Sequence, residues 1–312
     1  MNSTLITVIT YCGAVISGLA VLENLLVIVV LAATSYLRIK YFTFVFNLAL
    51  ADLGFSVMLI AYALNRDHVL SALMQSLLFV AVLMILAVAV NRYLTLTISP
   101  PSRYDALVTP CRLAMVCLLL WCFSFALNVP VVLVASKDVH LILSAWFRPP
   151  FVLVVWIVTA VLYLFVFRKI NSYTSLPTIP SSPVCGTNNT DMTEQSPPRV
   201  GQTRRLMITF SIILVTSFIC WTPFNIAQIM EYFIKTGQST ISDDTLKNFN
   251  TIAAFVYCLS PAINPLIYWW RLDGFRQGFK ELFCCCLLQK PEQLVEEIVD
   301  DNEDQQNTEP IG

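Results

Sequence analysis

The stretch Leu259-Ser260-Pro261-Ala262-Ile263-Asn264-Pro265-Leu266-Ile267-Tyr268 lies in a long apolar run near the C-terminus. A proline inside a helix removes one backbone donor, so Pro265 leaves the carbonyl of Pro261 without its usual partner. In hydrocarbon that carbonyl needs another donor, and the amide of Asn264 can supply one. Tyr268 follows one helical turn after Asn264, on the same face. The stretch predicts a deformable, hydrated helix that faces the interior of a bundle.

An Asn-Pro-x-x-Tyr match arises by chance in roughly one chain in fifty, so the rest of the sequence has to support this interpretation. The chain has 312 residues, of which 57% are hydrophobic and 12% charged, a composition typical of membrane proteins. A helical span needs ~20 mostly apolar residues. Seven runs qualify, at roughly 5–33, 42–64, 69–97, 112–135, 149–168, 205–234 and 248–270. The predicted fold is an all-α membrane protein, a seven-transmembrane helix bundle.

The distribution of Lys and Arg predicts the orientation of this bundle. With the N-terminus outside, the outer loops hold Arg66, Lys137, Arg148, Lys235 and Lys247, and the rest of the 19 Lys and Arg residues fall at cytoplasmic ends. We therefore expect an extracellular N-terminus and a cytoplasmic C-terminus.

The remaining segments are short or polar. Residues 1–4 form an extracellular N-terminus with a possible glycosylation site at Asn2. The bundle and its surface helix occupy 5–286, and the second outer loop is short, from about Ser136 to Arg148. Within the bundle, 171–203 is rich in Pro, Ser, Thr and Asn and predicts a flexible third cytoplasmic loop. Residues 287–312 form an acidic cytoplasmic tail.

Two spans carry ionisable or amide side chains at the depth of the hydrocarbon. Glu23 and Asn24 lie in the first span and Asp52 in the second. Such residues are costly in lipid and usually face the interior or a cavity. We expect Asp52 to face inward, whereas Glu23 could face inward or stay protonated at a packed seam between helices.

The segment after the last span is amphipathic. Phe275, Phe279 and Phe283 recur at helical spacing beside Arg276 and Lys280, which predicts a short helix on the membrane surface. Cys284, Cys285 and Cys286 follow it, and their position favours lipidation over three idle thiols. No histidine lies near them, so we expect no metal site. None of the ten cysteines falls in a predicted outer loop, and we expect no structural disulfide.

Taken together, the motifs and their spans resemble a rhodopsin-like (class A) G-protein-coupled receptor over residues 5 to 286. The matching residues are Asn24, Leu48-Ala49-Leu50-Ala51-Asp52, Asn91-Arg92-Tyr93, Trp121, Tyr163, Cys220-Trp221-Thr222-Pro223-Phe224 and Asn264-Pro265-Leu266-Ile267-Tyr268. Each motif alone is modest, but their order and placement on seven spans are specific.

The resemblance implies roles for these residues, listed here by group. Asn24, Asp52 and Asn264 would form a polar core that can hold a sodium ion; Trp221 and Pro223 would form a hinge; Arg92, Tyr93, Tyr163, Asn264, Pro265 and Tyr268 would form the activation switch. The implied partners are an extracellular ligand, a heterotrimeric G protein, membrane lipid and, after activation, a receptor kinase and arrestin. No nucleic acid is expected. The implied location is the plasma membrane.

Several departures from the family pattern are visible. The outer cysteine pair of most relatives is missing, and Val155 stands where span five usually has a proline. Both losses resemble the melanocortin, cannabinoid, adenosine and lysophospholipid receptors. The opsins of the family need a lysine in span seven, where this chain has Cys258, which argues against a light sensor.

The position of Met74 bears on the ligand. Amine receptors of the family carry an aspartate there, so we expect a ligand that is not a protonated amine. Counting along the family pattern gives a candidate pocket of Met74, Gln75, Leu78, Phe224, Asn225 and Gln228. Such an apolar pocket with amide groups suits a lipid, a nucleoside-like molecule or a peptide side chain. Ordinary helix packing is the alternative for these residues.

Two restraints that hold most relatives closed are absent. Asn91 replaces the acidic residue before Arg92, and Thr203 replaces a glutamate at the foot of span six. Arg204 and Arg205 follow Thr203 and are expected to repel Arg92. Raised basal activity is the prediction, and a hydrogen bond from Asn91 to Arg92 is the alternative.

Other classes of function fit less well. A transporter predicts internal repeats or a charged pathway through several spans, and neither is visible. An enzyme needs a nucleophile and base in one place, and the two histidines, His68 and His140, both fall in predicted outer loops.

Overall fold

The computed structural model describes residues 3–37, 42–65, 67–98, 100–134, 137–174 and 197–283. In chain order the elements are α1 Ser3–Ala33, η1 Ser35–Leu37, α2 Phe42–Leu64, α3 His68–Thr97, α4 Pro101–Leu107, α5 Pro110–Val134, α6 Lys137–Trp146, α7 Arg148–Thr174, α8 Pro197–Lys235, α9 Asp243–Arg271 and α10 Asp273–Phe283. Within the described residues, seven helices are long and apolar enough to cross a membrane. The predicted seven-helix fold is confirmed.

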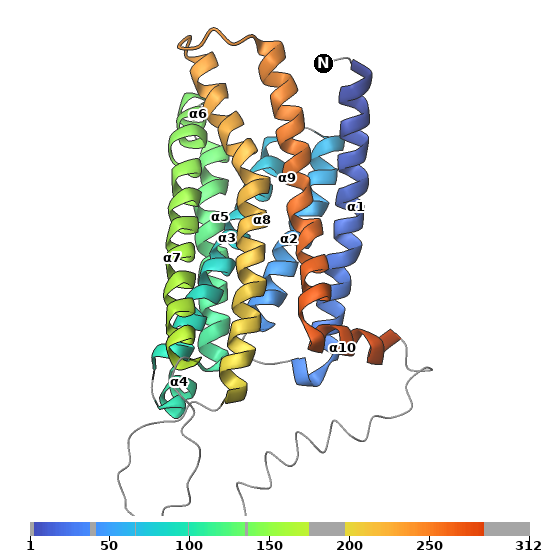
Figure 1. Ribbon diagram of the computed structural model, residues 1–312. Coiled ribbons are helices and arrows are strands. Elements are labelled where there is room, and N and C mark those ends of the chain that lie inside the picture. The colour runs from blue at the N-terminus through green and yellow to red at the C-terminus, as the bar shows by residue number, and fades with distance from the viewer. Residues whose placement is uncertain are drawn as a thin grey trace, which may run out of the picture.

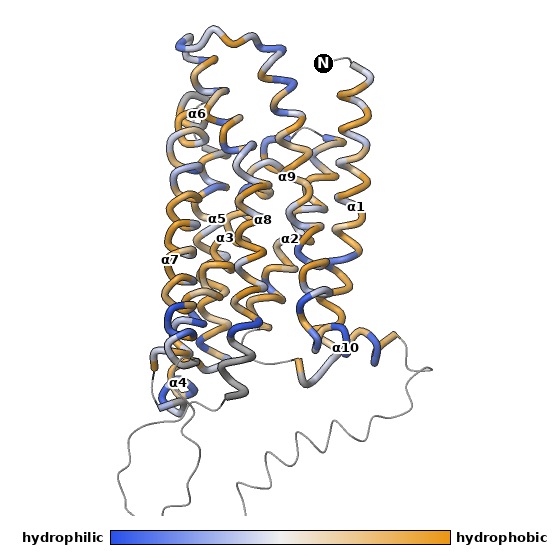
Figure 2. The backbone as a smooth tube through the Cα atoms, in the orientation of Figure 1, coloured by the Kyte–Doolittle hydropathy of each residue, from blue (hydrophilic) through white to orange (hydrophobic). Residues whose placement is uncertain are grey.

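The long helices stand side by side as one bundle (Figure 1). The start of α1 and the short helix α6 lie at one end, called the outer end here, and α4 and α10 lie at the inner end. Helix α3 is the most deeply buried of the seven spans. Apolar residues dominate the middle of the bundle, and hydrophilic residues gather toward its two ends (Figure 2). That pattern is the one a protein needs to match the hydrocarbon thickness of a bilayer.

Two helices at the outer end begin with side-chain caps. The carboxylate of Asp67 accepts a 2.9 Å hydrogen bond from the backbone N–H of Val69 at the start of α3. The hydroxyl of Ser242 accepts one of 3.3 Å from the backbone N–H of Thr245 at the start of α9. Each cap satisfies an N–H that has no partner within its helix.

Four prolines lie inside helices that continue through them: Pro130 in α5, Pro223 in α8, and Pro261 and Pro265 in α9. Proline in a helix interior frees a carbonyl one turn earlier. Spans six and seven thus carry the deformable sites that the sequence predicts.

Two predicted loops differ from the structure. The second outer loop contains the helix α6, and Arg148 is the first residue of α7 with 5% of its surface exposed. The third inner loop is shorter than 171–203, because α7 continues to Thr174 and α8 begins at Pro197. Apolar periodicity ends at the membrane boundary, whereas a helix can continue into water, which explains both errors.

The predicted surface helix is present as α10, which runs across the foot of the bundle (Figure 1). Its apolar face packs on α9, with the rings of Trp269 and Phe279 4.8 Å apart. Gly278 faces the end of α1, where an added Cβ would lie 2.9 Å from Thr34 Oγ1 and 3.1 Å from Leu37 Cδ1. Absence of a side chain at Gly278 is what allows this close approach.

Candidate functional site

A buried hydrogen-bond network joins α1, α2 and α9 in the middle of the bundle. Asn264 Nδ2 donates to Asp52 Oδ2 at 2.8 Å. Asn24 Nδ2 donates to the carbonyl of Pro261 at 2.9 Å and also to the carbonyl of Ala20. The prediction that Asn264 serves the Pro261 carbonyl is therefore wrong. Asn24 of the neighbouring helix supplies that donor, which leaves the amide of Asn264 free to hold Asp52.

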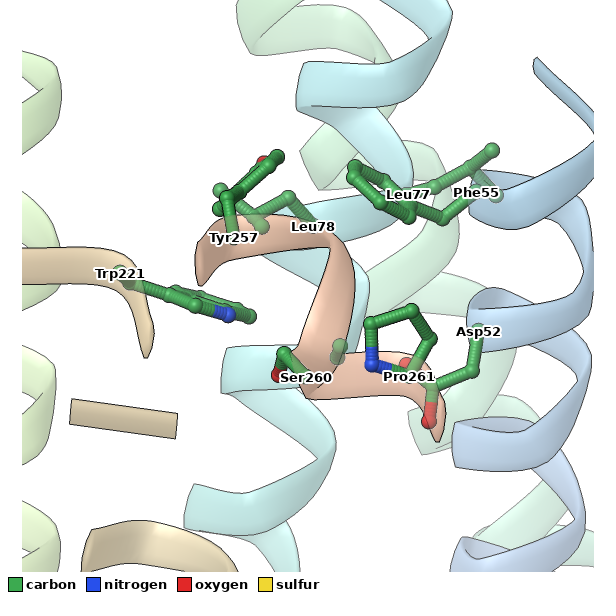
Figure 3. Close-up of a pocket in the computed structure, with 9 residues that line it drawn as sticks. Asp52, Phe55, Leu77, Leu78, Trp221, Tyr257, Ser260 and Pro261 are labelled. Atoms are coloured by element: carbon green, nitrogen blue, oxygen red, sulfur yellow. The ribbon is translucent and has the colours of Figure 1, made fainter. Parts of the chain in front are cut away.

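A cavity of about 10 Å³ adjoins Asp52. Its lining comes from α2, α3, α8 and α9: Asp52, Phe55, Leu77, Leu78, Ala81, Trp221, Tyr257, Ser260 and Pro261. Figure 3 shows Trp221 and Tyr257 on one side of it and Asp52 on the other. A space of this size holds about one water molecule or a small bare ion.

The atoms around this cavity suit a hard cation. Of the residues that line it, Asp52, which is 6% exposed, offers a carboxylate and Ser260 a hydroxyl. Asn264, which is bonded to Asp52, has a buried Oδ1 atom without a hydrogen-bond partner among the described residues. Carboxylate, amide and hydroxyl oxygens are the ligands that such cations prefer. The donor set thus fits the predicted sodium ion. The carboxylate of Glu23 is half-buried elsewhere on α1, with Oε2 unpartnered in the described structure.

The predicted hinge lies in an aromatic cluster. Trp221 is 3% exposed, and its ring lies 5.7 Å from that of Trp156 on α7 and 6.2 Å from that of Tyr257 on α9. Tyr257 also stacks on Phe224, with ring centroids 4.7 Å apart. Pro223 follows two residues after Trp221, where it weakens the backbone of α8.

The predicted inner switch contains two buried phenols. Tyr163 is 5% exposed and Tyr268 0%, and neither hydroxyl has a hydrogen-bond partner among the described residues. Arg92, also part of the predicted switch, is 6% exposed. Tyr93 is exposed at the surface of the bundle. A buried hydroxyl without a partner costs about 1–3 kcal/mol, so both phenols would gain from an arrangement that pairs them.

The residue before Arg92 has a partner that the sequence did not reveal. Tyr104 on α4 donates its hydroxyl to Asn91 Oδ1 at 2.9 Å, and Asn91 is 4% exposed. The helix α4 lies outside the seven apolar runs, and a tyrosine there gave no signal of this contact.

Arg205, one of the two arginines expected to repel Arg92, has an acidic partner in the structure. Arg205 Nη1 pairs with Asp273 Oδ2 of α10 at 2.9 Å, and both side chains are more than half exposed. An exposed pair of this kind is worth about 0.2–1 kcal/mol. Asp273 also pairs with Arg276, so one carboxylate serves two arginines.

The predicted ligand-pocket residues line the outer half of α3 and α8. Met74, Gln75 and Leu78 are buried on α3. Phe224, Asn225 and Gln228 on α8 are half-buried. Leu78 also lines the cavity beside Asp52, which connects the outer half of the bundle with its polar core. Packing accounts for the burial of the α3 residues equally well, so their role in binding stays a prediction.

Some predicted sites lie outside the described residues. They are the glycosylation site at Asn2, the lipidation sites Cys284, Cys285 and Cys286, and most of the third inner loop. The described cysteines, Cys12, Cys111, Cys117, Cys122, Cys220 and Cys258, are free thiols.

Comparison with known proteins gives the family. The model of the seven-transmembrane receptors of the rhodopsin family matches residues 23–268. This chain belongs to that family. It is 25% identical over 295 residues to melanocortin receptor 5 of Mus musculus, a match that covers 88% of this chain and 84% of that receptor. Melanocortin receptor 4 of Danio rerio is 25% identical over 285 residues, with 85% of this chain and 81% of the relative covered.

The family resolves several of the open alternatives. The chain is a G-protein-coupled receptor near the melanocortin group, as its motifs predict, and the transporter interpretation has no support. Receptors of this kind are multi-pass proteins of the plasma membrane that respond to an extracellular ligand. They are not enzymes as a class.

Proposed function

We propose that this receptor has its N-terminus outside the cell and passes the signal of a non-amine ligand to a heterotrimeric G protein. The orientation rests on the excess of Lys and Arg at the inner end. The ligand class rests on Met74, a buried thioether side chain at the place where amine receptors carry an anion. A cationic ligand would lack a counter-charge at Met74.

The proposed mechanism of activation depends on the cavity beside Asp52. One small space is lined by Trp221 and Tyr257 and also by Asp52, which accepts a hydrogen bond from Asn264 (Figure 3). A ligand that displaces either ring changes the packing around Asp52 directly. Since a ligand shifts a conformational equilibrium only by binding the two states differently, contact with these rings is how it would do so.

Outward movement of α8 about Pro223 is the proposed response. It would bring Arg92, Tyr163 and Tyr268 into a cleft at the inner end. Pairing of the two phenol hydroxyls would stabilise that open arrangement. Tyr93, which is exposed, would contact the G protein.

A sodium ion at Asp52 would oppose this movement. Asp52 would supply the negative charge and Asn264 and Ser260 neutral oxygens. When bound, the ion supplies a positive charge that holds α2, α3 and α9 around the cavity. The space has room for an ion in the present close packing of helices, and opening α8 removes one wall of it.

Termination of the signal would involve a receptor kinase and arrestin acting on the third inner loop. Lipidation of Cys284, Cys285 and Cys286 would anchor the segment after α10 to the membrane. Since the relatives are melanocortin receptors, a melanocortin-like peptide is one ligand to include in a screen.

Ligand-free nucleotide exchange on a panel of G proteins tests the proposed function. Membranes containing the full chain should accelerate exchange on at least one G protein, and the same membranes carrying Arg92→Ala should not. If a simple monoamine activates the receptor potently, and Met74→Ala abolishes that activation, the proposal of a non-amine ligand is overturned. Tags at each terminus, probed on intact cells, test the orientation.

A further inference from the structure

A groove of about 540 Å³ opens at the inner end of the bundle, beside the short helix α4 (Figure 1). It is lined by the end of α3, by α4 and by the beginning of α5: Thr97, Ile98, Arg103, Ala106, Leu107 and Arg112. Its volume lies in the range of about 300–1,000 Å³ that is usual for small-molecule sites. The mechanism of activation proposed above uses none of these residues.

The described lining of the groove carries two positive charges and no negative one. Arg103 and Arg112 are both exposed. Arg103, Ala106 and Leu107 of α4 stand at positions i, i+3 and i+4, which is one face of a helix. Asp105 comes two residues after Arg103, on a different face, and is not among the lining residues. An anion in the groove would therefore meet two cations and no carboxylate.

The guanidinium of Arg112 is held in a fixed position. Its Nη1 atom donates to the backbone carbonyls of Ala106 at 3.1 Å and Leu107 at 3.0 Å. Both carbonyls belong to the last turn of α4, where a helix supplies no backbone donor for them. The side chain of Arg112 has no further hydrogen bond or ion pair in the described part of the chain. A guanidinium has five N–H donors, so Nε and Nη2 keep theirs for a ligand.

The second guanidinium has no partner to lose. The side chain of Arg103 makes no ion pair or hydrogen bond among the described residues. A guanidinium matches the oxygens of a phosphate or a carboxylate through two parallel hydrogen bonds. A phosphate has enough oxygens for Arg103 and Arg112 together, whereas a carboxylate that is bound by one arginine has little left for the other. Two arginines around one groove therefore favour a phosphate.

The lipid-facing side of α5 begins at Arg112. Met115, Val116 and Leu119 are exposed apolar residues of a membrane-spanning helix. They follow Arg112 by three, four and seven positions, a spacing that places all four residues on one face. An exposed apolar face of a spanning helix lies against the hydrocarbon of the bilayer. Arg112 thus stands where that face ends, at the boundary between hydrocarbon and the polar inner end.

We propose that this groove binds the phosphate group of an anionic lipid from the inner leaflet, whose acyl chains lie along Met115, Val116 and Leu119. The choice of leaflet rests on the proposed orientation of the receptor. The cytoplasmic leaflet carries the negative surface charge, and basic pockets between spanning helices on that side suit acidic head groups. A soluble phosphate shares the chemistry that the two arginines recognise, but the apolar face of α5 favours the lipid.

The test uses the purified full-length receptor in detergent and native mass spectrometry, which measures lipid binding without a G protein. The probes are dioctanoyl phosphatidate, dioctanoyl phosphatidylcholine and inorganic phosphate. Phosphatidate should bind at least about fivefold more tightly than phosphatidylcholine, which has the same chains but no net charge. Equal affinity for the two lipids would overturn the proposal. Equimolar inorganic phosphate should not displace phosphatidate, and displacement would assign the groove to a soluble phosphate instead.

Arg103→Gln is the most informative variant, because Arg103 has no described ion pair or hydrogen bond to lose. Its affinity for phosphatidate should fall about fivefold, the effect of one cation near a membrane surface. The double variant with Arg112→Gln should lose about twentyfold or more. Lys280→Gln removes an exposed cation of α10 at the same end of the bundle and should bind as wild type. Unchanged affinity in Arg103→Gln, or an equal loss in Lys280→Gln, contradicts the proposal.

Melting temperature without lipid separates binding from a structural role. Arg103→Gln should melt with wild type, and a clearly lower value would show that Arg103 holds the fold and would overturn its assignment to a ligand. The lipid site and the proposed receptor function also fail separately. Phosphatidate binding without nucleotide exchange would overturn the signalling function alone, and exchange without phosphatidate binding would overturn the lipid site alone.

Discussion

Asn264 donates a 2.8 Å hydrogen bond to Asp52, which ties α9 to α2 at the centre of the bundle. The same Asn264 keeps its Oδ1 atom buried and unpartnered in the described structure. Of these two bonded residues, Asp52 lines the small cavity. Trp221 lines the same cavity as Asp52, so the predicted hinge and the polar core meet at this point.

The first prediction concerns sodium and Asp52. In wild type, exchanging Na⁺ for a large organic cation at constant ionic strength should raise ligand-free nucleotide exchange about fivefold or more, within the usual range of coupling energies. Asp52→Asn keeps the size of the side chain and removes its charge, so its exchange should not respond to Na⁺. Titration of exchange against NaCl in both proteins is the measurement. If wild type and Asp52→Asn respond equally to Na⁺, the ion does not bind at Asp52.

A second prediction concerns the carbonyl that Pro265 frees. In Asn24→Ala the carbonyl of Pro261 loses its donor, and a buried acceptor without a partner costs about 1–3 kcal/mol. The melting temperature of the purified receptor should fall. Asn128 is equally buried but bonds within its own helix, to the carbonyl of Ser124, so Asn128→Ala is the matched control and should cost less. A larger fall in the control would show that the link from α1 to α9 is unimportant.

The contrast between Asn24 and Asn264 shows what the sequence could and could not predict. Pro265 identifies the freed carbonyl by local rules alone, since a proline acts on the residue four positions earlier. The donor that satisfies it comes from α1, 237 residues away along the chain. Which of two amides reaches that carbonyl depends on how the helices pack, and apolar periodicity does not contain this information.

The third prediction concerns the docking of α10. Gly278→Ala places a Cβ 2.9 Å from Thr34 Oγ1, closer than side chains pack, so α10 should shift from the end of α1. Melting temperature and surface expression should both fall. Gly18 is also helical, but a Cβ there meets nothing within 4 Å. Gly18→Ala should therefore be neutral or slightly stabilising, by up to about 1 kcal/mol. Identical behaviour of the two variants would argue against close packing at Gly278.

A fourth prediction assigns desensitisation to the third inner loop. After Cys286 the Ser or Thr side chain that remains is Thr308, whereas residues 172–196 carry ten Ser and Thr residues: Ser172, Thr174, Ser175, Thr178, Ser181, Ser182, Thr187, Thr190, Thr193 and Ser196. Phosphates there would supply the charge that arrestin reads with basic clusters. Deletion of 181–196 should abolish stimulated arrestin recruitment, measured by proximity in living cells. If truncation after Leu288 abolishes it instead, the tail is the responsible segment.

Arg148 and Asn91 mark a further limit of reading the sequence. Counting charges placed Arg148 in an outer loop, because its neighbours Trp146 and Phe147 precede two prolines and the apolar run of span five. In the structure Arg148 is the first residue of α7 and is buried. It follows α6, a helix that no predicted span contains. The partner of Asn91 likewise comes from α4, a seven-residue helix between spans. Both features depend on short helices outside the predicted spans, and the apolar runs of the sequence do not predict such helices.

Signalling without ligand is the fifth prediction, and it follows from Asn91. A charge-assisted hydrogen bond is worth about 1.5–3 kcal/mol, and about 1.4 kcal/mol changes a population tenfold. Asn91 cannot form a charge pair with Arg92, and its Oδ1 atom is already bound to Tyr104. Asn91→Asp would restore an acidic partner, and Thr203→Glu would add one at the foot of α8. Each variant should lower the active fraction.

The most direct measurement is ligand-free nucleotide exchange at matched surface expression in wild type, Asn91→Asp, Thr203→Glu and Arg92→Ala. Wild type should exceed Asn91→Asp and Thr203→Glu by up to about tenfold, and Arg92→Ala should be inactive on every G protein. The account holds that the missing restraints leave this receptor partly active without ligand. Ligand-free nucleotide exchange in wild type that is no higher than in Arg92→Ala would contradict it.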